Sequence, residues 1–124
     1  MAYPTAVYNW NPFKQGTDWS RSVTFKTNGV EDTLTGWTAK FTVRDEDNTG
    51  GALILDISTT VNANGSIITI TGGVVTITLS DVDTDLLIFN TYYYDLKLIS
   101  TAGTGSKEDT PLTGTLTILR NVAA

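Results

Sequence analysis

Apolar and polar residues alternate along most of the chain, in short runs separated by turn residues. The clearest run spans residues 37–44, in which every second side chain is apolar: Trp37, Ala39, Phe41 and Val43. Comparable runs cover residues 19–27, 52–58, 66–80, 91–100 and 110–122. A period of two is typical of β-strands whose two faces lie in different surroundings, so we expect each run to form a strand or a hairpin.

Turn-forming residues divide these runs at short intervals. Asn28-Gly29 and Gly72-Gly73 each lie between two alternating segments, where a tight hairpin needs residues that tolerate a positive φ. Residues 80–87 are the one helical candidate, because Ser80 is a suitable N-cap and acidic residues fill the first turn after it. Those acidic residues are Asp81, Asp83 and Asp85.

The number and spacing of the predicted strands indicate an all-β fold. Seven to eight short strands with one helical turn fit a single antiparallel β-sandwich of two sheets, similar to an immunoglobulin domain. We assign the sandwich to residues 12–124, with a short edge strand at 13–16 and an inner face at Leu53, Leu55 and Ile57. At 124 residues, one domain buries a sufficient core without disulfides.

The first eleven residues differ from the rest, because they are rich in aromatic residues and lack clean alternation. We expect residues 1–11 to form an extended N-terminal arm. Its aromatic side chains Tyr3, Tyr8 and Trp10 are candidate interface residues, since tyrosine and tryptophan are common anchors at protein interfaces. The arm either folds back over one end of the sandwich or inserts into a neighbouring subunit.

Composition excludes several functions. The chain has no cysteine and no histidine, so it lacks cysteine ligands for metals, the commonest general base and the commonest transition-metal ligand. A net charge of −5 disfavours nucleic-acid binding. Neither a signal peptide nor a membrane-spanning run is present, which predicts a soluble protein made in the cytoplasm, without membrane contact. We expect a non-enzymatic protein without a cofactor.

One acidic loop resembles a calcium-binding loop in its spacing. Asp45, Asp47 and Thr49 occupy the first, third and fifth positions of the segment "DEDNTGGALILD", and Asp56 occupies the twelfth. The last position is Asp rather than the bidentate Glu, and strands rather than helices flank the loop. An acidic hairpin loop is therefore the simpler interpretation, and we assign no metal site.

Three stretches together resemble a known phage domain. They are "LTGWT" at 34–38 continuing to Val43-Arg44, Tyr94-Asp95-Leu96, and "LTG" at 112–114; an early Gln15-Gly16 with Asp18 also fits. This pattern is similar to the N-terminal domain of the upper baseplate proteins of lactococcal phages, a module of phage tail and fibre proteins. The similarity spans residues 13–122 and marks six structural residues: Gly36, Trp37, Arg44, Tyr94, Asp95 and Gly114.

The resemblance implies a virion structural protein made in the host bacterial cytoplasm. Its expected partners are other virion proteins and copies of itself. We expect a tail or baseplate adaptor, with a capsid decoration protein as the alternative. A calcium- or carbohydrate-binding sandwich is the alternative from another class. Because Arg44 and Asp95 both lie opposite the core face, we also expect them to form an ion pair if their strands are adjacent.

Overall fold

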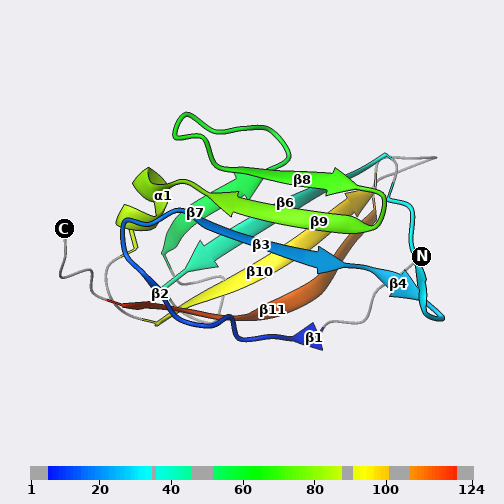
Figure 1. The fold of residues 1–124 in the computed structure, drawn as a ribbon, viewed down its shortest axis with the longest axis horizontal. Coiled ribbons are helices and arrows are strands. Elements are labelled where there is room, and N and C mark those ends of the chain that lie inside the picture. The colour runs from blue at the N-terminus through cyan, green and yellow to red at the C-terminus, as the bar shows by residue number, and fades with distance from the viewer. Residues whose placement is uncertain (1–5, 35, 46–51, 88–90, 101–106, 120–124) are drawn as a thin grey trace.

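The computed structural model of the protein describes residues 6–34, 36–45, 52–87, 91–100 and 107–119 (Figure 1). The larger sheet contains β1 (Ala6–Val7), β2 (Phe13–Lys14), β6 (Trp37–Arg44), β7 (Leu53–Ser58), β10 (Thr91–Ser100) and β11 (Lys107–Leu119). The second sheet contains β3 (Trp19–Thr24), β8 (Ile67–Thr71) and β9 (Val74–Leu79). A small hairpin is formed by β4 (Lys26–Thr27) and β5 (Val30–Glu31), and the helix is α1 (Asp81–Asp85).

Almost all of the regular structure in the described residues is strand, which confirms the all-β prediction. The two main sheets lie face to face. In the larger sheet the strand order is β1-β11-β10-β6-β7, with β2 also paired to β11, and this sheet curls like half of a barrel. The second sheet, in the order β3-β9-β8, lies across one face of it (Figure 1). In the described part of the chain, no helix is long and apolar enough to cross a membrane.

The sequence predicts that all strands are antiparallel, but the structure contains parallel pairs as well. Both β1 and β2 run parallel to β11, and with them the described residues form eleven strands rather than seven or eight. Each of these two strands is only two residues long. A segment of two residues is too short to show alternation. These two strands form where the N-terminal segment runs along the edge of β11.

The predicted alternation matches the observed core. Ala39, Phe41 and Val43 are fully buried on β6, and β9 and β10 bury their predicted faces in the same way. Trp19 of β3 joins the two sheets, since its ring stacks on Phe41 with 6.1 Å between the ring centroids. Leu53 is an exception: the register between β6 and β7 shifts next to Val43, which leaves Leu53 exposed.

Turns form at the positions that the sequence indicates. Asn28 and Gly29 have φ values of 51° and 79° and connect β4 to β5 in a two-residue hairpin, and Gly72-Gly73 connects β8 to β9. Gly36, one of the structural residues of the phage-like pattern, has a φ of 83° directly before β6, a conformation that glycine adopts most readily.

The helix begins where it was predicted, but one of its acidic residues has an unexpected environment. The Ser80 side chain caps α1 by accepting a hydrogen bond from the Asp83 amide at 3.3 Å. The Asp83 side chain is 2% exposed and accepts hydrogen bonds from Asn62 and Asn64, each at 2.8 Å, and from the Ser66 hydroxyl. This carboxylate therefore fixes the loop between β7 and β8 to the start of the helix.

Hydrogen bonding controls the ionisation of Asp83. Burial alone would raise the pKa of this carboxyl group, but hydrogen bonds from Asn62, Ser66 and Asn64 stabilise the charged form and hold the pKa below the ordinary value of 3.8. A folded-state pKa below the unfolded value stabilises the protein above the unfolded pKa, and this contribution is lost as the pH falls through the folded pKa.

We predict that Asp83→Asn lowers the free energy of unfolding by about 1–3 kcal/mol at pH 7, because an amide cannot accept all three hydrogen bonds. The difference in stability from the unmodified protein should shrink as the pH falls below 3.8. In that range the Asp83 carboxylate of the unmodified protein becomes protonated as the pH passes through its lowered pKa. Urea unfolding across this pH range measures both effects. Asp81→Asn, at an exposed position of the same helix, is the control. Equal effects of the two substitutions would contradict the prediction.

Candidate interaction site

The described part of the N-terminal arm lies along β11 of its own chain. The amide of Tyr8 donates to the Thr113 carbonyl at 2.8 Å, and the amide of Trp10 donates to the Thr115 carbonyl at 3.1 Å. Residues 6–10 thus extend the larger sheet at its edge, so this part of the arm packs on its own chain. Tyr3 lies outside the described residues.

Gly114 allows the arm to approach β11 this closely. A Cβ atom at Gly114 would lie 2.0 Å from the carbonyl oxygen of Tyr8, so no other residue fits there without moving the arm. On the neighbouring strand Tyr94 lies directly opposite Gly114, and its hydroxyl donates to the same Tyr8 oxygen at 2.6 Å. Burial raises the pKa of the Tyr94 hydroxyl, so this group stays protonated and remains a donor.

The two described aromatic residues of the arm have different environments. Trp10 is partly buried and packs against the core, with ring centroids 5.7 Å from Trp19 and 6.3 Å from Tyr94. Tyr8 packs edge to face on Trp10 at 4.6 Å but remains 48% exposed. Trp10 therefore belongs to the core of its own chain, whereas Tyr8 is also accessible from outside.

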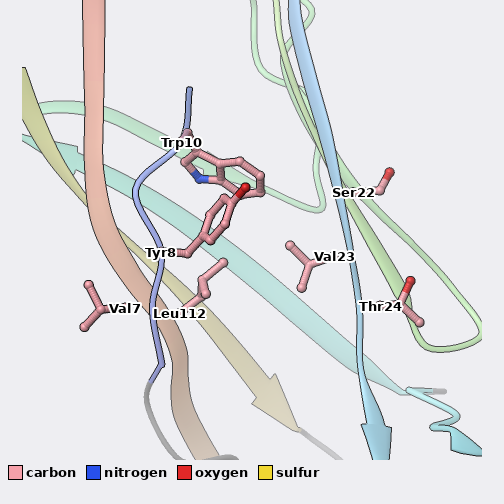
Figure 2. A pocket seen from close by; sticks show the side chains of 7 residues that line it. All are labelled: Val7, Tyr8, Trp10, Ser22, Val23, Thr24 and Leu112. Carbon is pink, nitrogen blue, oxygen red and sulfur yellow. The ribbon is translucent and has the colours of Figure 1, made fainter. Parts of the chain in front are cut away.

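A groove of about 410 Å³ lies between the arm and β3. Its wall on the side of the larger sheet consists of Val7, Tyr8, Trp10 and Leu112, and its wall on the other side consists of Ser22, Val23 and Thr24. Figure 2 shows Tyr8, Trp10 and Leu112 facing Val23 across the groove, whereas Ser22 and Thr24 extend to the far side of β3. The inside of the groove is therefore mainly apolar.

The β3 wall of this groove is a sheet edge. Among the described strands β3 pairs only with β9. The Phe25 amide donates to the Gly73 carbonyl on the β9 side at 2.8 Å. Because backbone groups alternate in direction along a strand, those of Ser20, Ser22 and Thr24 point away from β9, towards the open edge.

Arg21 covers one end of this edge. Its guanidinium group lies over the ring of Trp19, 5.2 Å from the centroid, and donates to the outward carbonyl of Ser20 at 2.7 Å. A charged side chain placed on the inner face of an edge strand is one of the ways in which proteins block unwanted strand pairing. The open part of the edge is therefore the stretch at Ser22 and Thr24, beside the groove.

Part of the phage-like pattern lies close together in the fold, while Trp37 pairs with Ser100 at the other end of β6. Val43 pairs with Tyr94 across β6 and β10, and Tyr94 pairs with Gly114 across β10 and β11. Arg44 lies opposite Tyr93, and Asp95 lies opposite Thr42, so Arg44 and Asp95 are diagonal neighbours on adjacent strands. The strand adjacency that the predicted ion pair requires is present, and the ion pair itself stays a prediction.

The candidate calcium ligands are only partly described. Asp45 closes the end of its loop by accepting a hydrogen bond from the Ala52 amide at 2.7 Å. Asp56 lies within β7 and forms an ion pair with Lys40 at 3.5 Å. The structure does not bring Asp45 and Asp56 together. Asp56 pairs with Thr42 of the adjacent strand β6, and Thr42 lies three residues before Asp45. Asp47 and Thr49 lie outside the described residues.

In the described part of the chain, no group of three or more acidic residues has the arrangement needed to hold a metal ion. No protein-family model matches the chain, and no curated protein matches it either.

The groove was not predicted from the sequence. One signal was available: Arg21 lies between Trp19 and Val23 on a face that is otherwise apolar. A charge at such a position indicates an edge strand with an exposed rim, because a central strand would bury it. The opposite wall gave no such signal, since it depends on where the arm lies.

We predict that Gly114→Ala and Tyr94→Phe are energetically coupled, because both act on the Tyr8 carbonyl. Gly114→Ala should lower the free energy of unfolding by about 1–3 kcal/mol through steric displacement of the arm. Tyr94→Phe should lower it by about 1 kcal/mol through the lost hydrogen bond. Once the arm is displaced, the Tyr94 hydroxyl has less to lose, so the double variant should be less destabilised than the sum by at least about 0.5 kcal/mol.

Urea unfolding of the two single variants and the double variant measures this coupling. Gly29→Ala is the matched control, because Gly29 also has a positive φ but lies in the β4–β5 hairpin with no neighbouring atom within 4 Å of its Cβ position. Its effect should add to that of Tyr94→Phe. Additive effects of Gly114→Ala and Tyr94→Phe would show that the arm is not held in this way.

Proposed function

We propose that the chain is a non-enzymatic structural protein of the bacteriophage virion, and that it acts through protein–protein contacts as a tail or baseplate adaptor. The single observation that carries the proposal is the combination of an open strand edge with an apolar groove, on a framework that an internally bound arm makes rigid. Such a surface suits the binding of a polypeptide. We also propose that the two sheets form an immunoglobulin-like β-sandwich.

Three residues of the phage-like pattern support the proposal, because they occupy connected positions. Val43, Tyr94 and Gly114 follow one another across three neighbouring strands, and Gly114 and Tyr94 together hold the Tyr8 carbonyl. Short motifs that meet in one place are more informative than the same motifs on unrelated surfaces. These motifs describe a shared framework. The phage domains that the chain resembles have roles in assembly.

The outer surface also suits a protein that remains packed among others. On β3 and β9, Ser22 bonds to Thr76 at 2.8 Å, and Ser20 and Thr78 lie 3.3 Å apart in the same arrangement. Hydroxyl ladders of this kind satisfy side chains across the sheet without forming large apolar patches. On this face of the second sheet, recognition then falls to the groove and the open edge beside it.

We predict that purified virions contain the chain in a fixed number of copies. Quantitative mass spectrometry of particles, banded by density and washed with high salt, measures the copy number relative to the major capsid protein. A few to several dozen copies are expected for a tail or baseplate protein, whereas hundreds would indicate capsid decoration. Presence in the host lysate together with absence from washed particles would contradict the proposal. A non-structural protein of the same phage serves as the control for carry-over.

A further inference from the structure

We propose that the groove beside β3 is a binding site for one extended segment of another protein, which adds to the second sheet as a fourth strand. The inference rests on the proposed function for the source of the segment, a neighbouring virion protein, but not for the site itself. The unpaired backbone of β3 supplies hydrogen bonds to the added strand. The apolar side chains inside the groove form a floor on which every second side chain of that strand would pack.

The backbone of β3 favours an extended occupant. Ser22 and Thr24 direct their amide and carbonyl groups towards the groove side, and no described residue pairs with them. Backbone groups in this alternating arrangement match the groups of an added β-strand, and a helix or a loop cannot satisfy them in register. Arg21 blocks the position of Ser20, so the register of the added strand is confined to the Thr24 end.

The floor of the groove favours a segment with small apolar residues at alternate positions. Tyr8, Leu112 and Val23 face the space that the fourth strand would occupy (Figure 2). None of the residues that line the groove is charged. Inward-facing charges on the segment would lose their hydration without gaining a partner, whereas valine or alanine side chains would cover Tyr8. The outward-facing positions would continue the hydroxyl face formed by Ser22 and Thr24.

A second copy of this chain fits the groove less well than a lone segment. In Figure 1, β11 and β1 continue beyond β3, where the second sheet has no further strand. If two copies paired edge to edge through β3, these extensions would enter the same space. The net charge of −5 on each copy also opposes self-association. A single strand, by contrast, occupies only the missing fourth position of the second sheet.

The site is too small to hold a partner tightly by itself. The edge of β3 spans six residues, or about 20 Å. One added strand of that length buries less than the roughly 1,200 Å² at which stable protein interfaces begin. A contact of this size is useful where many copies are held close together, because the effective concentration then replaces intrinsic affinity. A virion provides that arrangement.

A synthetic peptide tests the site without knowledge of the natural partner. The probe is acetylated and amidated, with the sequence Lys-Thr-Val-Thr-Val-Thr-Val-Thr-Lys, and its control replaces the central valine and the threonine after it with proline. We expect the probe to shift the amide NMR signals of Ser22 and Thr24 and to slow their hydrogen exchange at least about fivefold. The control should bind at least about tenfold more weakly, because one of the two prolines removes an amide that would bond β3 whether the added strand is parallel or antiparallel. Unchanged signals at Ser22 and Thr24 with millimolar probe would overturn the proposal.

Variants at one position identify the edge as the binding element. Ser22→Pro removes an amide that points away from β9, so the pairing of β3 with β9 is kept, and affinity for the probe should fall about tenfold. Ser22→Ala keeps the amide and should bind within twofold of the unmodified chain. Equal binding by both variants would overturn the proposal. If Ser22→Pro fails to fold, hydrogen exchange of the unmodified chain still decides the question.

Two further outcomes separate this inference from the proposed function. If the chain belongs to virions and Ser22→Pro is incorporated as efficiently as Ser22→Ala, the groove is not the docking site, although the structural role remains. If the probe binds at β3 but the chain is absent from virions, the groove is a binding site and the proposed function is wrong. A concentration-dependent dimer that Ser22→Pro dissociates would overturn the choice of occupant.

Discussion

The arrangement of this protein depends on one close approach between two backbone segments. The Tyr8 carbonyl passes so near to Gly114 that a Cβ atom there would lie 2.0 Å from it, and the Tyr94 hydroxyl binds the same oxygen from the neighbouring strand. This contact fixes the course of the N-terminal segment. It places Trp10 against Trp19 at one end of the gap between the sheets, and Tyr8 at the border of the groove. Both the core and the candidate binding surface follow from it.

The features that the sequence predicted are those that local physics determines. Alternation fixed the inner faces of β6, β9 and β10, because a one-residue error would expose every apolar side chain of the strand. The Asn28-Gly29 hairpin and the Ser80 cap depend on backbone conformation within a few residues, which these residue types favour directly. Each of these predictions needed only its own segment of the chain.

The features that escaped prediction depend on distant parts of the chain. The strand β1 exists only because the N-terminal segment follows β11, which begins about a hundred residues later, and the parallel pairing of the predicted edge strand β2 has the same origin. Asp83 looked like an ordinary helix-start acid, and only the fold brings Asn62, Asn64 and Ser66 to it. The groove requires both the arm and β3. Sequence pattern alone left the course of the arm open between its own chain and a neighbouring subunit, and it assigned Asp83 to the first turn of the helix, since neither segment identifies its distant partner.

The same contrast separates framework from recognition. Gly114 and Tyr94, which carry the phage-like pattern, act inside the fold by holding the arm, and neither lines the groove. The residues that do line it, such as Tyr8, Val23 and Leu112, lie on β3, on the arm and along the inner face of β11. A related chain could keep the framework and change its partner by altering Val23 or Tyr8 alone. Resemblance in this fold therefore reports how the framework is built, while the proposed binding site lies apart from it, at the β3 edge and its groove.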